Sequence, residues 1–296
     1  MKAKFLKIDD GIRYMFFASF MFALMGAVAK ILSSNLPSIE IVFFRNIFGF
    51  FLIIATLFKK PMRHTGGKPF LLLFRGLMGF LALLAFFYNI AHIPLGDAMT
   101  YSKTSPIFTA LFAWIFLKET LGIRGWFALV IGFVGIVLIA KPTGIAMDKT
   151  AWLGIFSGVG AALAYTAIRE LKQYYDTRAI VLSFMGVGTV GPLILMVLSP
   201  YVAIKELDML FASFVIPSKV EWIYIIMLGL FATLAQVYMT KAYGATQAGI
   251  VGAVSYSNIP FSIMIGLSIG DPFPDPVTLG GIGLVVIAGI VIARKK

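Results

Sequence analysis

The chain has 296 residues, of which 60% are hydrophobic and only 13% are charged, and this composition excludes an ordinary water-soluble globular protein. The formal net charge of +12 is spread between apolar runs without forming a basic patch or tail, so we expect no nucleic-acid partner. The sequence contains no cysteine, which excludes a disulfide framework, thiolate chemistry and a cysteine-based metal site.

Ten apolar runs follow one another along the chain, and we interpret each as a membrane-spanning helix. A helix rises 1.5 Å per residue, so about twenty residues cross roughly 30 Å of hydrocarbon. The runs do not alternate as the strands of a β-barrel do. The predicted spans are 12–31, 39–58, 70–91, 97–117, 123–140, 151–171, 179–199, 220–243, 247–269 and 277–293. The long connection at 200–219 contains an apolar stretch, 207–216, that is too short to span and is predicted to be an interfacial helix.

The two halves of the chain repeat one design. A shift of 154 residues superposes Pro106 on Pro260 and Gly135 on Gly289 without a gap. Such self-similarity indicates an internal duplication. We therefore predict two five-helix repeats, 1–142 and 143–296.

The distribution of Lys and Arg predicts how these repeats lie in the membrane. Of the 25 basic residues, seventeen fall on one side of the predicted spans, four fall on the other and four lie within spans. The side richer in Lys and Arg faces the cytoplasm, which places both termini there. Because each repeat has an odd number of spans, the repeats are expected to have opposite orientations. Inverted repeats around a site at the membrane midplane are typical of alternating-access carriers.

Several short motifs follow one another in a recognisable order. They are Asn35-Leu36-Pro37, Ile41-Val42-Phe43-Phe44-Arg45, Arg75-Gly76, Ile93-Pro94-Leu95-Gly96-Asp97-Ala98, Ser105-Pro106 and Leu117-Lys118-Glu119. Together with the ten spans and the duplication, they resemble the EamA-type branch of the drug/metabolite transporter superfamily. The resemblance implies a ten-helix carrier with a central cavity. The substrates of this family range from amino acids to nucleotide sugars, and the resemblance does not choose among them. The second half departs from the pattern, since Arg45 corresponds to Phe184 under a shift of 139 residues and Glu119 to Phe273 under the shift of 154.

Four basic residues lie within the predicted spans: Lys30, Arg45, Arg75 and Lys103. A cation at the bilayer centre costs about 2.5–3.5 kcal/mol on the insertion scale, so each is a candidate for function. Lys30 is close enough to a span end for its ammonium to reach the headgroups. Arg45 is expected to be structural, paired with Glu40 or with carbonyls at the helix end. For Arg75 both roles stay open.

Lys103 is the strongest candidate, because it lies within a span in a polar step that begins at Tyr101. Pro106 follows it and frees a backbone carbonyl on the preceding turn. The alternative is a structural lysine bound to a carbonyl or to Asp97.

Polar and aromatic residues from facing helices are expected around Lys103. The predicted substrate-binding residues are Lys103, Tyr101, Tyr88, Asn89, Tyr165, Gln236, Tyr238, Tyr256, Asn258 and Arg75. Buried Tyr and Asn need hydrogen-bond partners, which a packed helix interface supplies as well as a ligand does. By contrast, Gly132 with Gly135, and Gly154 with Gly158, are expected to permit close contact between helices.

The predicted cavity is positively charged, because no acidic residue lies in the middle of a span. A carboxylate proton relay is therefore not expected. Such a cavity suits a substrate with a carboxylate or phosphate, moved by facilitated diffusion or exchange. In an alternative mechanism, Lys103 itself loses a proton in the low-dielectric site and couples transport to proton movement.

We expect a secondary transporter that exports a small polar metabolite, an amino acid or a related carboxylate-bearing compound, across a bacterial inner membrane. An uptake or exchange carrier for a vitamin, nucleotide or organic anion is the alternative. An enzyme is disfavoured, because the sequence has neither H-E-x-x-H nor G-x-S-x-G, and an ATP-driven pump is disfavoured because it has no G-x-x-x-x-G-K-[ST]. We expect no cofactor and no metal, a small-molecule substrate and the lipid bilayer as partners, and a monomer or homodimer.

Overall fold

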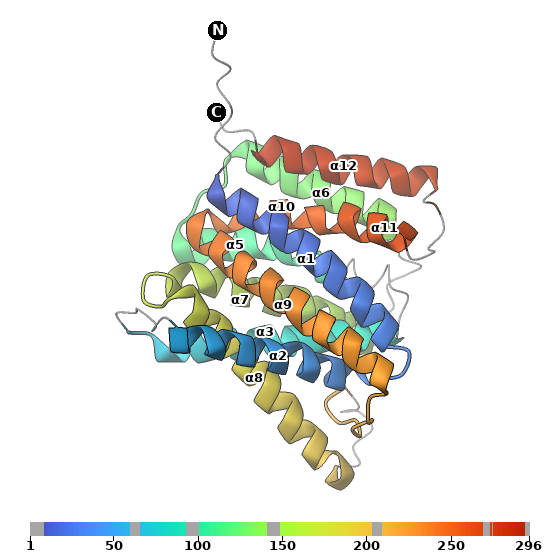
Figure 1. Ribbon diagram of the computed structural model, residues 1–296. Coiled ribbons are helices and arrows are strands. Elements are labelled where there is room, and N and C mark those ends of the chain that lie inside the picture. Colours follow the sequence, from blue (N-terminus) through green and yellow to red (C-terminus); the bar gives the residue numbers. More distant parts are fainter. Residues whose placement is uncertain are drawn as a thin grey trace.

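The computed structural model describes residues 9–59, 66–92, 101–140, 149–202, 209–268, 273 and 275–293, and all regular structure in these ranges is helical (Figure 1). The helices are α1 (Asp10–Leu32), α2 (Ser38–Lys59), α3 (Pro69–His92), α5 (Ser105–Leu117), α6 (Ile123–Ala140), α7 (Lys149–Leu171), α8 (Thr177–Leu198), α9 (Lys219–Ala245), α10 (Ala248–Val254), α11 (Asn258–Ser268) and α12 (Pro276–Ala293), with short 3₁₀ turns at Ser199–Tyr201 and Ser255–Ser257.

The predicted all-helical membrane fold is confirmed. Seven segments of the described chain are long and apolar enough to cross a membrane, and one of them, Ala248–Ser268, combines α10, a 3₁₀ turn and α11. The shorter apolar helices α5, α6 and α12 supply the remaining predicted spans. The predicted interfacial helix is wrong where it is described, because 209–218 has no helix. That segment is held as a loop, with the Val215 amide donating to buried Glu40.

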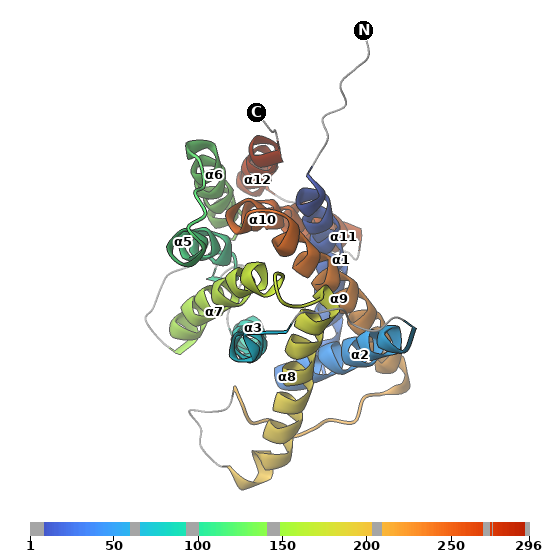
Figure 2. The ribbon, with the colours of Figure 1, turned by 90° about the vertical axis from the view of Figure 1, so that its left-hand side faces the viewer.

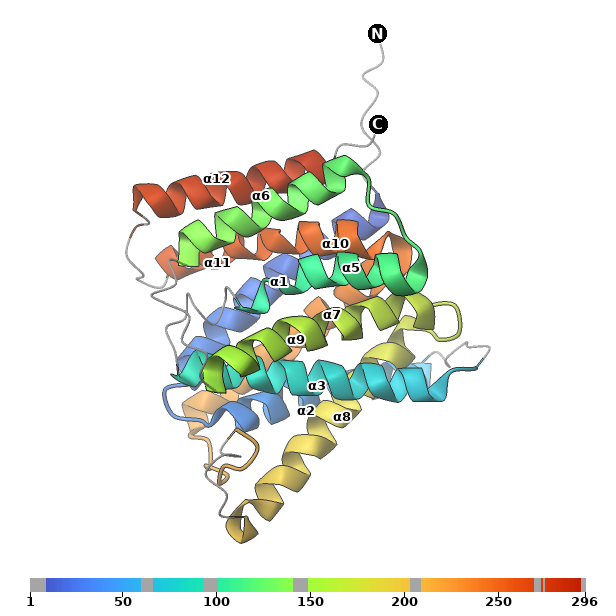
Figure 3. The same cartoon turned by 180° about the vertical axis from the view of Figure 1, so that it is seen from behind.

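The helices of the two halves are interleaved. Helix α1 packs on α9, and the matching pair from the other half is α7 on α3. In the same way, α2 packs on α9 and α8 packs on α3. The pairs α2–α8, α5–α10 and α6–α12 also join one half to the other. Figure 2 views the bundle from the end at which α1 begins and shows α6 and α12 as an outer pair, far from α8. Figures 1 and 3 show that α1 begins and α12 ends at this same end, which we call the terminal end.

Glycines set the distance between α6 and α12, as expected for Gly135. A Cβ on Gly135 would lie 2.7 Å from the Gly281 carbonyl oxygen, and a Cβ on Gly281 would lie 2.6 Å from that of Gly135. The second expected glycine pair also permits close contact, since Gly154 packs against the Tyr101 ring and Gly158 against Thr104. Small residues of this kind let membrane helices approach closely.

Gly281→Ala should therefore destabilise the protein, because its methyl group meets a backbone carbonyl that cannot rotate away. We expect a loss of about 1–3 kcal/mol, the usual range for overpacking. Gly283→Ala on the same helix is the matched control, since nothing lies within 4 Å of its added Cβ. Thermal unfolding in detergent should show a lower midpoint for Gly281→Ala only. Equal midpoints for the two variants would contradict the close α6–α12 contact.

Candidate functional site

A cavity of about 610 Å³ lies inside the bundle. Its walls come from α1, α2, α3, α7, α8, α9 and α11, together with the turn before α5. It reaches the surface near the junction of α1 and α2, where the lining residues Lys30 and Ser33 are exposed. Buried Met15, in the first half of α1, lines its other end. The cavity thus opens away from the terminal end.

Five of the ten predicted site residues line this cavity. They are Arg75, Lys103, Tyr165, Gln236 and Asn258. They come from α3, the turn before α5, α7, α9 and α11, so the helices that the sequence singled out do converge. Tyr165 also stacks on Tyr243, another lining residue, with ring centroids 5.2 Å apart.

The other five predicted residues are not among those that line the cavity. Near the end of α3, Tyr88 stacks on His92 and the amide of Asn89 donates to the backbone of residue 150. The Tyr101 ring packs against Gly154, and Tyr238 packs against Phe17 and Lys241. Tyr256 is fully buried, with its ring against Gly132. These aromatic residues fill helix interfaces, the role that the sequence left open for them.

The Lys103 ammonium is held by neutral groups. Its Nζ donates to Asn258 Oδ1 at 3.2 Å, and Asn258 Nδ2 donates to the Ser19 carbonyl at 2.9 Å. Lys103 lies in a turn between residues 101–102, which are helical, and the start of α5 at Ser105. The proline at the second position of α5 is compatible with this break, since it donates no hydrogen bond. Asp97, the alternative partner, lies outside the described residues.

Two arginines share one aromatic ring. The Cζ atoms of Arg75 on α3 and Arg45 on α2 lie 4.6 Å and 5.4 Å from the centroid of Phe184 on α8. Both arginines line the cavity and are at most 2% exposed. Arg75 Nε and Nη1 have no hydrogen-bond partner. The two like-charged guanidinium groups also repel each other.

Arg45 was expected to be a structural residue paired with Glu40 or with carbonyls at the helix end, and this expectation is wrong. Its Nε contacts Met25 Sδ at 3.3 Å and its Nη1 donates to Asn46 Oδ1 at 3.1 Å, both of them neutral acceptors. Glu40 instead accepts from the Val215 amide, and its second oxygen has no partner. The duplication contained a signal for this role, because Arg45 and Phe184 occupy corresponding positions and meet where α2 packs on α8.

The cavity wall therefore carries positive charge and spare hydrogen-bond donors. Its described lining residues include Lys30, Arg45, Arg75 and Lys103 but no Asp or Glu. Gln236 Nε2 and Ser19 Oγ, both buried in the wall, also have no partner. Burying charges and donors without partners costs several kcal/mol in the empty protein. An anionic ligand would supply the missing acceptors.

At the terminal end, polar contacts tie the two halves together. Glu119, after α5, accepts from Arg169 Nε on α7 at 2.9 Å and from the Ala248 amide at the start of α10 at 3.0 Å. Arg169 Nη1 also donates to the Gly244 carbonyl on α9 at 3.1 Å. We call the two contacts of Glu119, which join the first half to the second, the Glu119–Arg169 bridge. It lies at the end of the bundle opposite the cavity opening.

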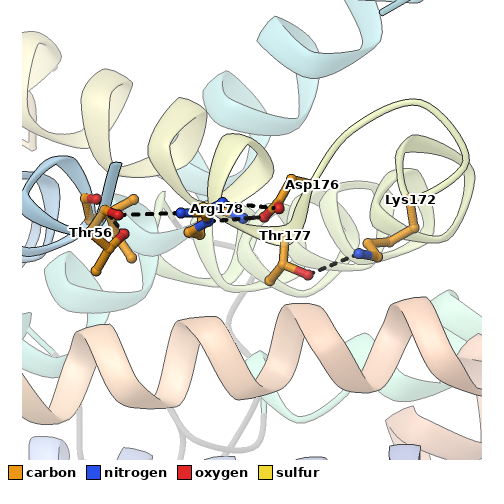
Figure 4. A network of polar contacts seen from close by, with 6 residues as sticks. Thr56, Lys172, Asp176, Thr177 and Arg178 are labelled. Carbon is orange, nitrogen blue, oxygen red and sulfur yellow. Dashed lines mark hydrogen bonds and ion pairs between the residues drawn. The ribbon is translucent and has the colours of Figure 1, made fainter. Parts of the chain in front are cut away.

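Further polar contacts lie at the same end of the bundle. Asp9 accepts from Thr246, and Lys68 pairs with Glu170. The hydrogen bond that Lys68 donates to the Glu170 carboxylate raises the pKa of the Lys68 ammonium. Figure 4 shows Arg178 between Asp176 and Thr56, whose carbonyl it reaches at 3.4 Å. These contacts again join the first half to the second.

Asp176 should make stability depend on pH. Burial raises the pKa of its carboxyl, but hydrogen bonds from the Arg178 side chain and amide outweigh this, and the net pKa lies below its ordinary value of 3.8. Since the folded pKa is the lower one, the carboxylate stabilises the protein above that ordinary value, and this contribution is lost as pH falls through the folded pKa. Asp176→Asn keeps a helix cap but no charge. Its unfolding midpoint should vary less with pH below about pH 4 than that of the wild type; identical pH profiles would contradict this role.

Comparison with known proteins agrees with the helical membrane fold. Residues 10–141 match the EamA-like transporter family. An "Uncharacterized transporter" from Helicobacter pylori is 33% identical, over 96% of this chain and 94% of the relative. The "Pseudopaline exporter CntI" of Pseudomonas aeruginosa is 34% identical, over 98% of both chains. A crystal structure with 15% identity has a TM-score of 0.76 over 95% of both chains, which shows the fold alone.

Proposed function

Because the chain belongs to the EamA-like transporters of the drug/metabolite transporter superfamily, and because its cavity is basic, we propose that it exports a small carboxylate-bearing metabolite across a bacterial inner membrane. The observation that carries the choice of substrate is the cavity wall, in which Arg45, Arg75 and Lys103 face no lining carboxylate among the described residues. Guanidinium and ammonium groups are the usual partners of carboxylates in proteins.

The proposed direction of transport rests on a relative, and the proposed orientation rests on the charge distribution. The Pseudomonas aeruginosa relative, which matches this chain along nearly its whole length, is named an exporter. The distribution of basic residues supports a cytoplasmic terminal end by the positive-inside rule. With this orientation the cavity opens to the periplasm, the state from which an exported substrate leaves and into which an imported one enters.

The mechanism we propose is alternating access between two inverted repeats, 1–142 and 143–296. The packing supports it. In repeat order α1 corresponds to α7, α2 to α8, α3 to α9 and α6 to α12, so the packed pair α1–α9 has its counterpart in the packed pair α7–α3. The pairs α2–α8 and α6–α12 each join two corresponding helices. If each repeat adopts the other's conformation, the cavity closes at one end and opens at the other. The Glu119–Arg169 bridge has to break in this exchange, since it joins the halves at the closed end.

Ligand screening on the purified protein tests the substrate class. Amino acids, organic acids, nucleotides and amines are added one at a time, and the shift of the unfolding midpoint reports binding to the folded state. We expect carboxylate-bearing compounds to stabilise the protein and amines to have no effect. Proteoliposomes loaded with the best ligand should then exchange it for labelled ligand outside. Stabilisation by amines alone would overturn the proposal.

Exchange of two anions is the second candidate, and the lack of a carboxylate among the described lining residues favours it. A carrier coupled to protons needs a group in the site that binds and releases them, and among the described lining residues Lys103 is the candidate that the sequence singles out. An exchanger moves labelled substrate only when substrate is present on both sides. A proton-coupled carrier also responds to a pH gradient across an otherwise empty liposome.

A further inference from the structure

The cavity contains two positive centres that differ in chemistry and come from different helices. The arginine centre consists of Arg45 and Arg75, whose Cζ atoms lie 5.4 Å and 4.6 Å from the centroid of the Phe184 ring. The lysine centre consists of Lys103 and Asn258, with the Ser19 carbonyl behind them. The first is built from α2, α3 and α8, and the second from the turn before α5, α11 and α1.

From these two centres we infer that the substrate carries two anionic groups, one for each centre. This inference rests on the proposed function and narrows it from a carboxylate-bearing metabolite to one with two separated carboxylates, or with a carboxylate and another acidic group. The cavity of about 610 Å³ is within the usual range of small-molecule sites, about 300–1,000 Å³.

The arginine centre is incomplete without an anion. Arg75 is 1% exposed, and its Nε and Nη1 have no partner, although a guanidinium has five N–H donors. Phe184 offers both arginines a cation–π contact, which is attractive but brings no negative charge. No carboxylate from the described lining residues therefore compensates these two like charges. A planar carboxylate matches the fork of donors on a guanidinium and would offset this charge.

The lysine centre is satisfied only in part. An ammonium has three donors and no acceptor, and the one hydrogen bond of Lys103 goes to a neutral amide oxygen. Asn258 in turn is fixed by its own bond to the backbone of α1, so it holds the ammonium in place without neutralising it. A second anionic group on the substrate would complete this centre.

A substrate with a single anionic group leaves one centre unpaired. Charged hydrogen bonds contribute about 1.5–3 kcal/mol each, which corresponds to about tenfold to hundredfold in affinity. A linear dicarboxylate of the right length should thus bind at least about tenfold more tightly than the monocarboxylate of equal length.

Straight-chain dicarboxylates of increasing length, and the matching monocarboxylates, provide the probes. Binding is measured on purified full-length protein by midpoint shift and by calorimetry. The test variants are Arg75→Met, Lys103→Met and the double variant. A fourth variant, Arg75→Lys, keeps the positive charge but removes the paired N–H donors of the guanidinium group. Arg124→Met and Lys219→Met are matched controls, because both side chains are exposed and neither lines the cavity. Size-exclusion profiles and baseline midpoints establish that each variant is folded.

We expect one dicarboxylate length to bind best in the wild type. Arg75→Met and Lys103→Met should each reduce its affinity to that of the monocarboxylate, the double variant should bind neither, and Arg75→Lys should lie in between. If monocarboxylates bind as tightly as every dicarboxylate and only one variant matters, the two-group inference is overturned while the proposed function stands. If no carboxylate of either series binds the wild type, both proposals fail.

Discussion

Replacing Arg75 by methionine should stabilise the empty protein and at the same time abolish its transport. The guanidinium is buried, has two unpartnered N–H groups and shares Phe184 with a second arginine. Exchanging buried charges for apolar residues of similar volume is often neutral or stabilising, by about 1–4 kcal/mol. The lost cation–π contact contributes about 2 kcal/mol or less in the opposite direction. We expect a net gain of about 1–2 kcal/mol, or several degrees in the unfolding midpoint.

The same substitution should reduce substrate exchange by about a hundredfold or more, because removing one member of a buried charge pair costs about 2–5 kcal/mol of binding. Midpoints without ligand and exchange rates in proteoliposomes measure the two effects separately. Arg124→Met, which removes an exposed arginine, should change neither by much. A variant that loses stability and transport together would assign Arg75 a structural role instead.

Glu119→Ala should shift the protein towards the state that opens at the terminal end. The carboxylate holds Arg169 on α7 and the first amide of α10, and both contacts bridge the two halves. The Arg169 and Glu119 side chains are 32% and 15% exposed, so solvent screens this bridge only in part. Losing a charged hydrogen bond of about 1.5 kcal/mol changes the ratio of the two states about tenfold.

Cysteine labelling can measure this shift directly, because the chain has no native cysteine. Ser157 is buried in the cavity wall, so a cysteine placed there reports which end of the cavity is open. In inside-out and right-side-out vesicles, Glu119→Ala should increase labelling from the cytoplasmic side and decrease it from the periplasmic side. Glu170→Ala, which removes the partner of the more exposed Lys68, is the control and should have a smaller effect. Unchanged labelling in folded Glu119→Ala would show that the bridge does not hold the terminal end closed.

The two predictions share a physical basis. In a binding site for an anion, cationic side chains have to stay shielded from water and without an anionic partner until the substrate binds. In a carrier, the contacts that hold the closed end together have to be weak enough to break. Arg75 illustrates the first requirement and the Glu119–Arg169 bridge the second. The unpaired arginine therefore lowers the stability of the resting protein in favour of function, whereas the bridge stabilises the resting state only modestly.

The sequence by itself determined the membrane class, the helical spans and the family. These are local or additive properties: about twenty apolar residues make a span wherever they occur, and a proline or a Gly-rich linker ends it. The sequence also identified Lys103 and Arg75, because a cation within a span is conspicuous whatever surrounds it. Asn258, Gln236 and Tyr165 were reached by the same reasoning, as polar groups on facing helices.

Only the tertiary structure decided which of these side chains share the cavity. That depends on how each helix is rotated about its axis, which is set by contacts between residues far apart in the chain. Lys103 meets Asn258 across 155 positions, and Arg45 meets Phe184 on another helix. For this reason Tyr88 and Tyr256, equally plausible in sequence, pack between helices, while Arg45, expected to pair with Glu40, turns towards Phe184 and the cavity. Hydropathy carries no information about rotation, so the two positive centres became visible only once the helices were packed.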